Sequence, residues 1–324
     1  MSAAGITRIF PDLTEDLLLN LFHKGAQAQW TSRSLDWSTP LLLSERQRLA
    51  LARLLTPVYF GEQTAMAGAS SILPSVMAAG EATAQLYIAS FIMDEARHFE
   101  TLTRLYRTLG HDPLGIRDMP ELLRYYHRLR QGDRVDWVWG ILISDVIGKH
   151  FYRELGPKQA APDPLFSGLT TRILKDESRH LAFAEHYLKR NLPGLAPERR
   201  RVMVEMRDEL MRLLDSMTRR VRDDALAFGV EIEDFLEGVV TEIDGVSRRV
   251  GLVGARSGPT DGEGPSDEAE VRTTQAEMAA PTRTERWFAL GAPATTAASD
   301  EDSLVARCFG CLLSLICSQR LATA

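Results

Sequence analysis

Two short runs of this sequence share the pattern Asp-Glu-x-Arg-His, one from Asp94 to His98 and the other from Asp176 to His180. In a helix, a glutamate and a histidine three residues apart leave the same face. A carboxylate oxygen and an imidazole nitrogen are ligands suited to iron, manganese or zinc. The two runs therefore predict two matching halves of a metal site, Glu95 with His98 and Glu177 with His180.

A helical bundle that holds two metal ions takes Glu-x-x-His from two helices and one carboxylate from each of the other two. In an antiparallel hairpin, residues at one level lie equally far from the turn. With the first turn at residues 78–80, the partner of Glu95 is Glu62. With the second turn centred near residue 160, the partner of Glu177 is Asp145, and Glu154 is the alternative. Asp145 stands in an apolar stretch, where an unpaired charge is costly.

The elements that must position these residues are helices. Up to about Arg249, apolar residues recur at steps of three and four, and alternating β-branched runs are missing, so the fold class is all-α. Prolines and glycines separate the periodic segments. The predicted helices cover residues 44–79 (with a kink near Pro57), 81–109, 119–130, 135–155, 164–191, 197–228 and 232–249.

The composition changes after the helical part, and it predicts three regions. Residues 1–250 form the helical di-metal domain. Residues 251–303 are rich in Gly, Pro, Ser, Thr and acidic residues, a composition that cannot bury enough surface to fold and predicts a disordered linker. Residues 304–324 form a short apolar segment that contains Cys308 and Cys311. Within the linker, residues 286–290 form an island that is either a weakly docked part of the tail or a partner-binding motif. The Cys308–Cys311 pair is interpreted as structural or incidental.

Charge and cysteine content exclude several classes of protein. The formal net charge of −6 argues against a nucleic-acid binder, whose surface is basic. No apolar run approaches the roughly 20 residues that cross a bilayer, so we expect no membrane span. The 3 cysteines all fall near the chain's end, which excludes a disulfide framework for the rest and favours a reducing cytoplasm.

Between about residues 21 and 188 the chain resembles the ferritin-like di-metal carboxylate proteins related to the small subunit of ribonucleotide reductase. Within them it is most similar to the small-subunit-like ligand-binding oxidases. The resemblance rests on Leu21-Phe22-x-x-Gly25 with Trp30, on Phe60-Gly61-Glu62, and on the two metal motifs. It implies a ferritin-like four-helix bundle with additional helices.

The chain departs from these relatives at several positions. Leu102 stands where reductase subunits carry their radical tyrosine, and Ala65 and Gly140 stand where some ligand-binding oxidases carry a Val–Tyr crosslink. The related N-oxygenases have a third histidine one turn before the second motif, where this chain has Ile173. The third-helix carboxylate is normally Glu, and here it would be Asp145.

The resemblance implies an oxidoreductase, a dioxygen-activating oxidase or oxygenase that acts on a small organic or acyl substrate. Its cofactor would be two metal ions per chain, Fe/Fe or Mn/Fe, and its partners O2, the substrate and an electron donor, with a homodimer as the expected assembly. The residues expected to bind the metals and carry the catalysis are Glu62, Glu95, His98, Asp145, Glu177 and His180. Three alternatives remain open: a reductase small subunit without its tyrosine, an iron-storage protein and a metal-free helical scaffold.

Further residues have expected supporting roles. Asp94 and Asp176 are candidate acceptors for the outer N–H groups of the histidines, and Arg97 and Arg179 pair either with carboxylates there or on the surface. Small residues near the expected ligands either leave an apolar pocket or allow close helix packing; these are Ala65, Ala69, Gly148 and Ala184. Tyr59 and Tyr152 are either redox-active tyrosines or residues of the core.

Overall fold

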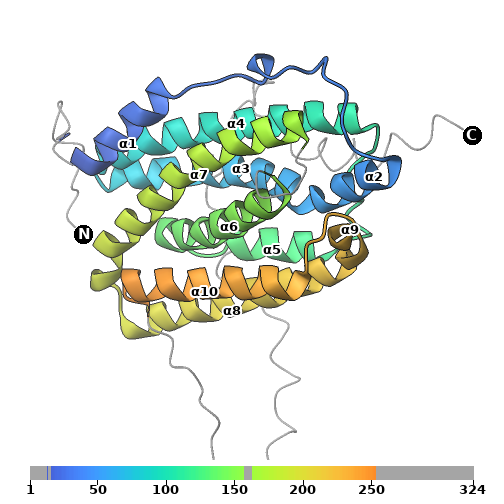
Figure 1. Ribbon diagram of the computed structural model, residues 1–324. Helices are drawn as coiled ribbons and strands as arrows, with labels where there is room; N and C mark the ends of the chain where they lie inside the picture. The colour runs from blue at the N-terminus through green and yellow to red at the C-terminus, as the bar shows by residue number, and fades with distance from the viewer. Residues whose placement is uncertain (1–12, 14–15, 157–162, 253–324) are drawn as a thin grey trace, which may run out of the picture. The chain divides into compact units, whose positions relative to one another are not determined.

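Four long helices form the centre of the fold. The computed structural model describes residue 13, residues 16–156 and residues 163–252 (Figure 1). Helix α3 (Thr56–Ala78) packs along α4 (Ala82–Leu109), and α6 (Arg134–Leu155) packs along α7 (Pro164–Asn191). The two hairpins face each other through contacts of α3 with α6 and of α4 with α7. The described residues contain no strand, so the predicted all-α bundle is confirmed.

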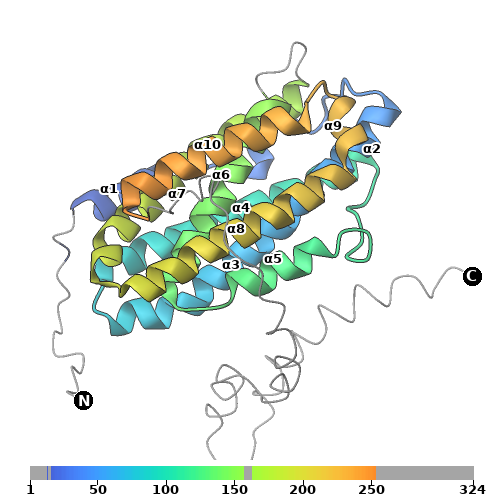
Figure 2. The same ribbon diagram turned by 90° about the horizontal axis from the view of Figure 1, so that it is seen from below.

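Further helices cover the bundle on two sides. On one side, α1 (Asp16–Gln27) lies on α4 and α7, and the one-turn helix η1 (Ser32–Ser34) follows it. On the other side, as Figure 2 shows, α8 and α10 lie side by side and pack on the second hairpin. Helix α8 spans Pro197–Arg220 and α10 spans Ile232–Val250. The other elements of the described residues are α2 (Glu45–Leu54), α5 (Glu121–Leu129), η2 (Leu192–Gly194) and α9 (Arg222–Leu226).

Local sequence signals explain where the helices of the bundle begin and end. Gly80 ends the turn between α3 and α4 with a φ of +74°, a conformation that glycine adopts without the steric cost of a Cβ atom. Asp163 caps α7 by accepting a hydrogen bond from the Phe166 amide, 3.0 Å away. These two positions fix where α4 and α7 begin.

Two of the predicted helices are interrupted. The segment expected as one helix over residues 44–79 is divided at Leu55, so Pro57 occupies the first turn of a new helix, where its missing N–H costs nothing. The segment expected over residues 197–228 is divided at Val221 into α8 and α9. The other predicted helices agree with the observed bounds to within two residues.

The chain's end lies largely outside the described residues. The predicted linker, the island at residues 286–290 and the cysteine-containing segment at 304–324 all fall there. The last described residues are part of the helical core, since Val250 and Leu252 are buried. The domain limits therefore stay a prediction. In the described part of the chain, no helix is long and apolar enough to cross a membrane.

The small residues on the Glu62 side of α3 serve helix packing. Ala65 and Ala69 are buried, and the indole of Trp137 on α6 lies directly against Gly68. The same indole makes an edge contact with Phe91 on α4. A bulky side chain thus fills the space that the small residues leave, and the close-packing alternative holds on this face.

Gly68 should therefore resist substitution far more than its neighbour Gly61 on the same helix. A methyl group at Gly68 would overlap the Trp137 indole, so Gly68→Ala should destabilise the metal-free protein by about 1–3 kcal/mol through overpacking. At Gly61 an added methyl meets nothing within 4 Å, so Gly61→Ala should stabilise by roughly 0.5–1 kcal/mol. Urea unfolding of both variants measures the difference, and equal effects would contradict this packing.

Candidate metal centre

Six buried acids and imidazoles meet between the four central helices. Glu62 of α3 lies beside Glu95 of α4, as their equal distances from the turn predict. The two motifs bring His98 and His180 together, with ring centroids 6.1 Å apart. None of the six side chains is more than 7% exposed. They are Glu62, Glu95, His98, Asp145, Glu177 and His180.

Two overlapping sets of these residues could each hold an ion. Glu62, Glu95 and His98 form one set, and Glu95, Glu177 and His180 form the other, with the donor atoms of each set within 4.8 Å of one another. Glu95 belongs to both sets, which suits a bridging carboxylate. Glu177 also reaches both histidines, at 3.7 Å from Nδ1 of His98 and 3.5 Å from Nδ1 of His180.

Asp145 lies at the edge of this cluster rather than within either set. It is buried, and its Oδ2 atom has no hydrogen-bond partner. Burial raises the pKa of Asp145 well above its usual value, and the charge of Glu177 raises it further. Glu154 lies two and a half turns further along α6, at the wall of an apolar cavity with Leu155, and belongs to neither set.

Both histidines present the same nitrogen to the carboxylates of the cluster. Nδ1 of His98 is 3.4 Å from Oε2 of Glu62, and Nδ1 of His180 is 3.2 Å from Oε1 of Glu95. These contacts lack hydrogen-bond geometry, so both Nδ1 atoms and Oε1 of Glu95 are buried without a partner. Buried polar atoms are rarely left unpaired. A pair of cations would satisfy all of them, so the residues present fit a di-metal centre.

The pKa values of the buried groups indicate the same need for positive charge. Burial alone would lower the pKa of His98, but Glu62 and Asp176 raise it to about 9. Burial likewise opposes the charge of His180, yet Glu177 and Asp94 raise its pKa to about 10. Burial and the charge of Glu62 raise the pKa of Glu95 well above its usual value. Without metal ions, the cluster retains protons to offset its carboxylates.

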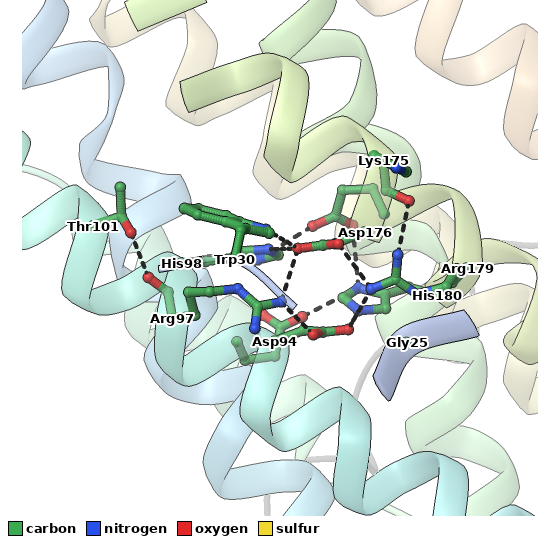
Figure 3. Close-up of polar contacts among 12 residues, drawn as sticks. Gly25, Trp30, Asp94, Arg97, His98, Thr101, Lys175, Asp176, Arg179 and His180 are labelled. Atoms are coloured by element: carbon green, nitrogen blue, oxygen red, sulfur yellow. Dashed lines mark hydrogen bonds and ion pairs between the residues drawn. The ribbon is translucent and has the colours of Figure 1, made fainter. Parts of the chain in front are cut away.

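The outer nitrogens of the histidines are held by the aspartates of the opposite motifs (Figure 3). Nε2 of His98 is 3.1 Å from Oδ2 of Asp176, and Nε2 of His180 is 3.4 Å from Oδ2 of Asp94. The pairing is reciprocal, because each aspartate comes from one motif and its histidine from the other. Such partners fix the orientation of ligand histidines. The expected role of both aspartates agrees with these contacts.

Two buried arginines connect the aspartates. Arg97 donates to both Asp94 and Asp176, and Arg179 donates to Asp94 at 2.9 Å and to Asp176 at 2.8 Å. Both guanidinium groups are less than a tenth exposed, so the surface alternative for them does not hold. The four side chains form a closed ring of charges, visible in Figure 3 between the two histidines and α1.

Several contacts of the site were not predicted from the motifs. Trp30 donates from Nε1 to Oδ2 of Asp176 at 2.8 Å, and the Arg97 guanidinium lies 5.0 Å from the centroid of the Trp30 ring. Tyr152 donates to Oε1 of Glu62 at 3.1 Å, whereas Tyr59 contacts Thr103. The available signal for Tyr152 was its position seven residues after Asp145, which places both on one helix face.

Comparison with known proteins identifies relatives of this arrangement. The pattern of the family described as P-aminobenzoate N-oxygenase AurF matches residues 69–243. That segment contains both motifs and Asp145, and Glu62 lies just before it. No curated protein matches the chain.

Solved structures show the same fold. One is an R2-like ligand-binding oxidase with an aerobically reconstituted Mn/Fe cofactor after a long soak, with a TM-score of 0.59 and 16% sequence identity over 77% of this chain and 98% of that one. Another is an R2-like ligand-binding oxidase without metal cofactor, with a TM-score of 0.60 and 16% identity over 73% of this chain and 97% of that one. The predicted ferritin-like fold and its resemblance to these oxidases are confirmed.

Each histidine contacts the aspartate of the other motif, and this arrangement leads to a prediction that differs from contacts within one motif. Asp176→Asn replaces the charged acceptor for His98 with a neutral amide and should weaken the ion nearest His98 by about 10–100-fold. In a double-mutant cycle, Asp176→Asn should then add little to His98→Ala but its full effect to His180→Ala. Chelator competition measures these affinities, with Asp94→Asn as the mirror-image variant. The opposite pattern of additivity would mean that each aspartate serves its own motif.

Proposed function

We propose that this chain, which belongs to the P-aminobenzoate N-oxygenase AurF family, oxidises the nitrogen of a small organic amine with O2. The chain is a di-metal oxidoreductase of the oxygenase and oxidase class. The proposal concerns its substrate and the residues that bind its metal ions. The ligand set rests on the pair of buried Nδ1 atoms, on His98 and His180, that face shared carboxylates without a hydrogen-bond partner. The amine substrate is supported by the family match.

In this proposal six side chains hold two ions, either Fe/Fe or Mn/Fe. Glu62 and His98 serve one ion and Glu177 and His180 the other, Glu95 lies between them, and Asp145 adds the third-helix carboxylate. When bound, the two ions would act as Lewis acids toward O2 and would pass on to it the electrons that an external donor supplies. Open coordination positions would admit O2 and the substrate.

The reaction class follows from a balance of atoms. A primary amine, O2, two electrons and two protons give a hydroxylamine and one water, so the N–H bond is replaced by N–OH and an external donor supplies the electrons. Ile173, buried and aliphatic, supplies no nitrogen ligand, so the set contains two histidines.

Electron delivery needs a connection to the surface, and we place it at Trp30. This half-buried indole is hydrogen-bonded to Asp176, which in turn contacts His98. The donor, a homodimeric assembly and a cytoplasmic location complete the proposal, the last supported by the confinement of cysteine to the chain's end. The family match favours this oxygenase over a reductase subunit, an iron-storage protein or a scaffold without metals.

The test of the function uses the metal-free protein loaded anaerobically with Fe(II), alone or with Mn(II). After addition of p-aminobenzoate as the probe amine and exposure to labelled O2, mass spectrometry should find one labelled oxygen atom on the amine nitrogen. His98→Ala is the control and should give no product. A protein that carries two ions, consumes O2 and leaves every amine tested unchanged would refute nitrogen oxidation but not the oxidase class.

Asp145 and Glu154 form a matched pair for testing the third-helix ligand. Asp145→Asn keeps the side chain's shape and removes a charge that offsets the cations, so it should weaken loading of the ion near His180 and abolish O2 consumption with little loss of helix content. Glu154→Gln makes the same chemical change beside the apolar cavity and should leave both properties unchanged. Metal analysis and circular dichroism measure the outcomes, and the reverse result would assign the ligand to Glu154.

A further inference from the structure

An open groove of about 530 Å³ lies on the solvent-facing side of the second half of α4. Trp37 forms one wall and comes from the connection between α1 and α2, which runs along α4 (Figure 1). Small-molecule sites have volumes of roughly 300–1,000 Å³, so the groove has room for a small organic ligand. The other lining residues follow one another on α4 at helical spacing; they are Phe99, Glu100, Thr103, Arg104, Arg107 and Thr108.

Two half-buried aromatic side chains line the groove, and both are held in place by other contacts. The indole N–H of Trp37 donates to the carbonyl of Ser32 at 2.7 Å. The ring of Phe99 stacks on the ring of Tyr59, with centroids 4.9 Å apart, and the Tyr59 hydroxyl is hydrogen-bonded to Thr103. A ligand that packs on these rings does not have to order them first. The aromatic lining therefore suits a flat, aromatic molecule.

The groove also carries a positive charge that no acid of the lining neutralises. Glu100 neutralises Arg104, because Nε of Arg104 donates to its carboxylate. Arg107 is exposed, and within the described part of the chain its side chain has no ion pair or hydrogen bond. The whole chain has a formal net charge of −6, so this local excess of positive charge is unusual for its surface. A guanidinium group binds a carboxylate through two parallel hydrogen bonds, and an anionic ligand is therefore expected.

Other classes of ligand fit this lining less well. A wholly apolar molecule would make no use of the Arg107 charge, and a cation would be repelled by both arginines. A nucleic-acid strand needs a row of cations to neutralise its phosphates, and here Glu100 interrupts the row. A single anionic group attached to an aromatic ring matches both the rings and the one unneutralised charge.

We propose that this groove is a binding site for a small planar aromatic carboxylate. The rings of the ligand pack on Trp37 and Phe99, and its carboxylate pairs with Arg107. Arg107 follows Phe99 by eight residues, about 12 Å along the helix, a separation that a two-ring acid and the long arginine side chain together span. Binding is noncovalent. It is independent of the proposed function, because no lining residue belongs to the metal centre.

The probe is 2-naphthoate, and its binding to the full-length, metal-loaded protein is measured by calorimetry. Two analogues separate the contributions of charge and ring. 2-Naphthamide keeps the rings without the charge, and decahydro-2-naphthoate keeps the charge without the aromatic rings. Each should bind about tenfold more weakly than 2-naphthoate, because each lacks one of the two interactions. Equal binding of all three compounds would overturn the proposal.

Variants of the lining test which residues make the contacts. Arg107→Gln should weaken 2-naphthoate about tenfold and leave 2-naphthamide unchanged, since only the acid uses the guanidinium. Trp37→Leu should weaken both compounds about fivefold through the lost ring contact. Arg212→Gln is the matched control, because Arg212 is an exposed arginine of α8 outside the groove, and it should bind like the wild type. Circular dichroism checks that every variant is folded.

Nuclear magnetic resonance of the ¹⁵N-labelled indoles locates the bound probe. The indole signal of Trp37, identified by its loss in Trp37→Leu, should shift as 2-naphthoate is added, and the signal of the buried Trp139 should stay in place. A wild-type protein without saturable binding overturns the site. Binding that Arg107→Gln and Trp37→Leu leave unchanged, with a Trp37 signal that does not move, also overturns it, because the acid then binds elsewhere. Both results leave the proposed function intact.

Discussion

The structure depends on balancing charge that four helices bury at one place. Asp94 and Asp176 are neutralised by Arg97 and Arg179, each of which bonds to both aspartates. Four further carboxylates are buried at the same centre, on Glu62, Glu95, Asp145 and Glu177. Two divalent cations carry four positive charges, which equals the charge of these carboxylates when both histidines are neutral. Since a buried charge without its partner is strongly destabilising, the ion pairs and the cations together make this core possible.

The ring of Asp94, Arg97, Asp176 and Arg179 also sets the geometry of the centre. Its contacts join α4 to α7, so the two motifs cannot slide past each other without breaking several buried hydrogen bonds. The same aspartates hold Nε2 of the histidines and leave Nδ1 directed at the glutamates. Helix α1 closes this side through the contact of Trp30 with Asp176. One network therefore performs two tasks, fixing the register of the bundle and selecting which nitrogen faces the metals.

Much of this could be predicted from the sequence, because the signals are local. The duplicated motif and helical periodicity predicted α4 and α7, and counting from the turn at Gly80 found Glu62. The crossed pairing of aspartates could not be predicted, since it depends on the rotation of α4 relative to α7, which periodicity does not encode. From the sequence alone, the small residues of α3 fit either a pocket or close helix packing. The structure shows close packing on this face, because the Trp137 indole lies against Gly68.

Anomalous X-ray diffraction from crystals of the iron-loaded protein tests the central claim most directly. Data collected on both sides of the iron absorption edge should give two peaks per chain between α3, α4, α6 and α7. One should be bonded to Nδ1 of His98 and the other to Nδ1 of His180, with a shared glutamate between them and Asp145 bonded to the second ion. A single peak, or ions bonded to the Nε2 atoms in place of the aspartates, would contradict the account.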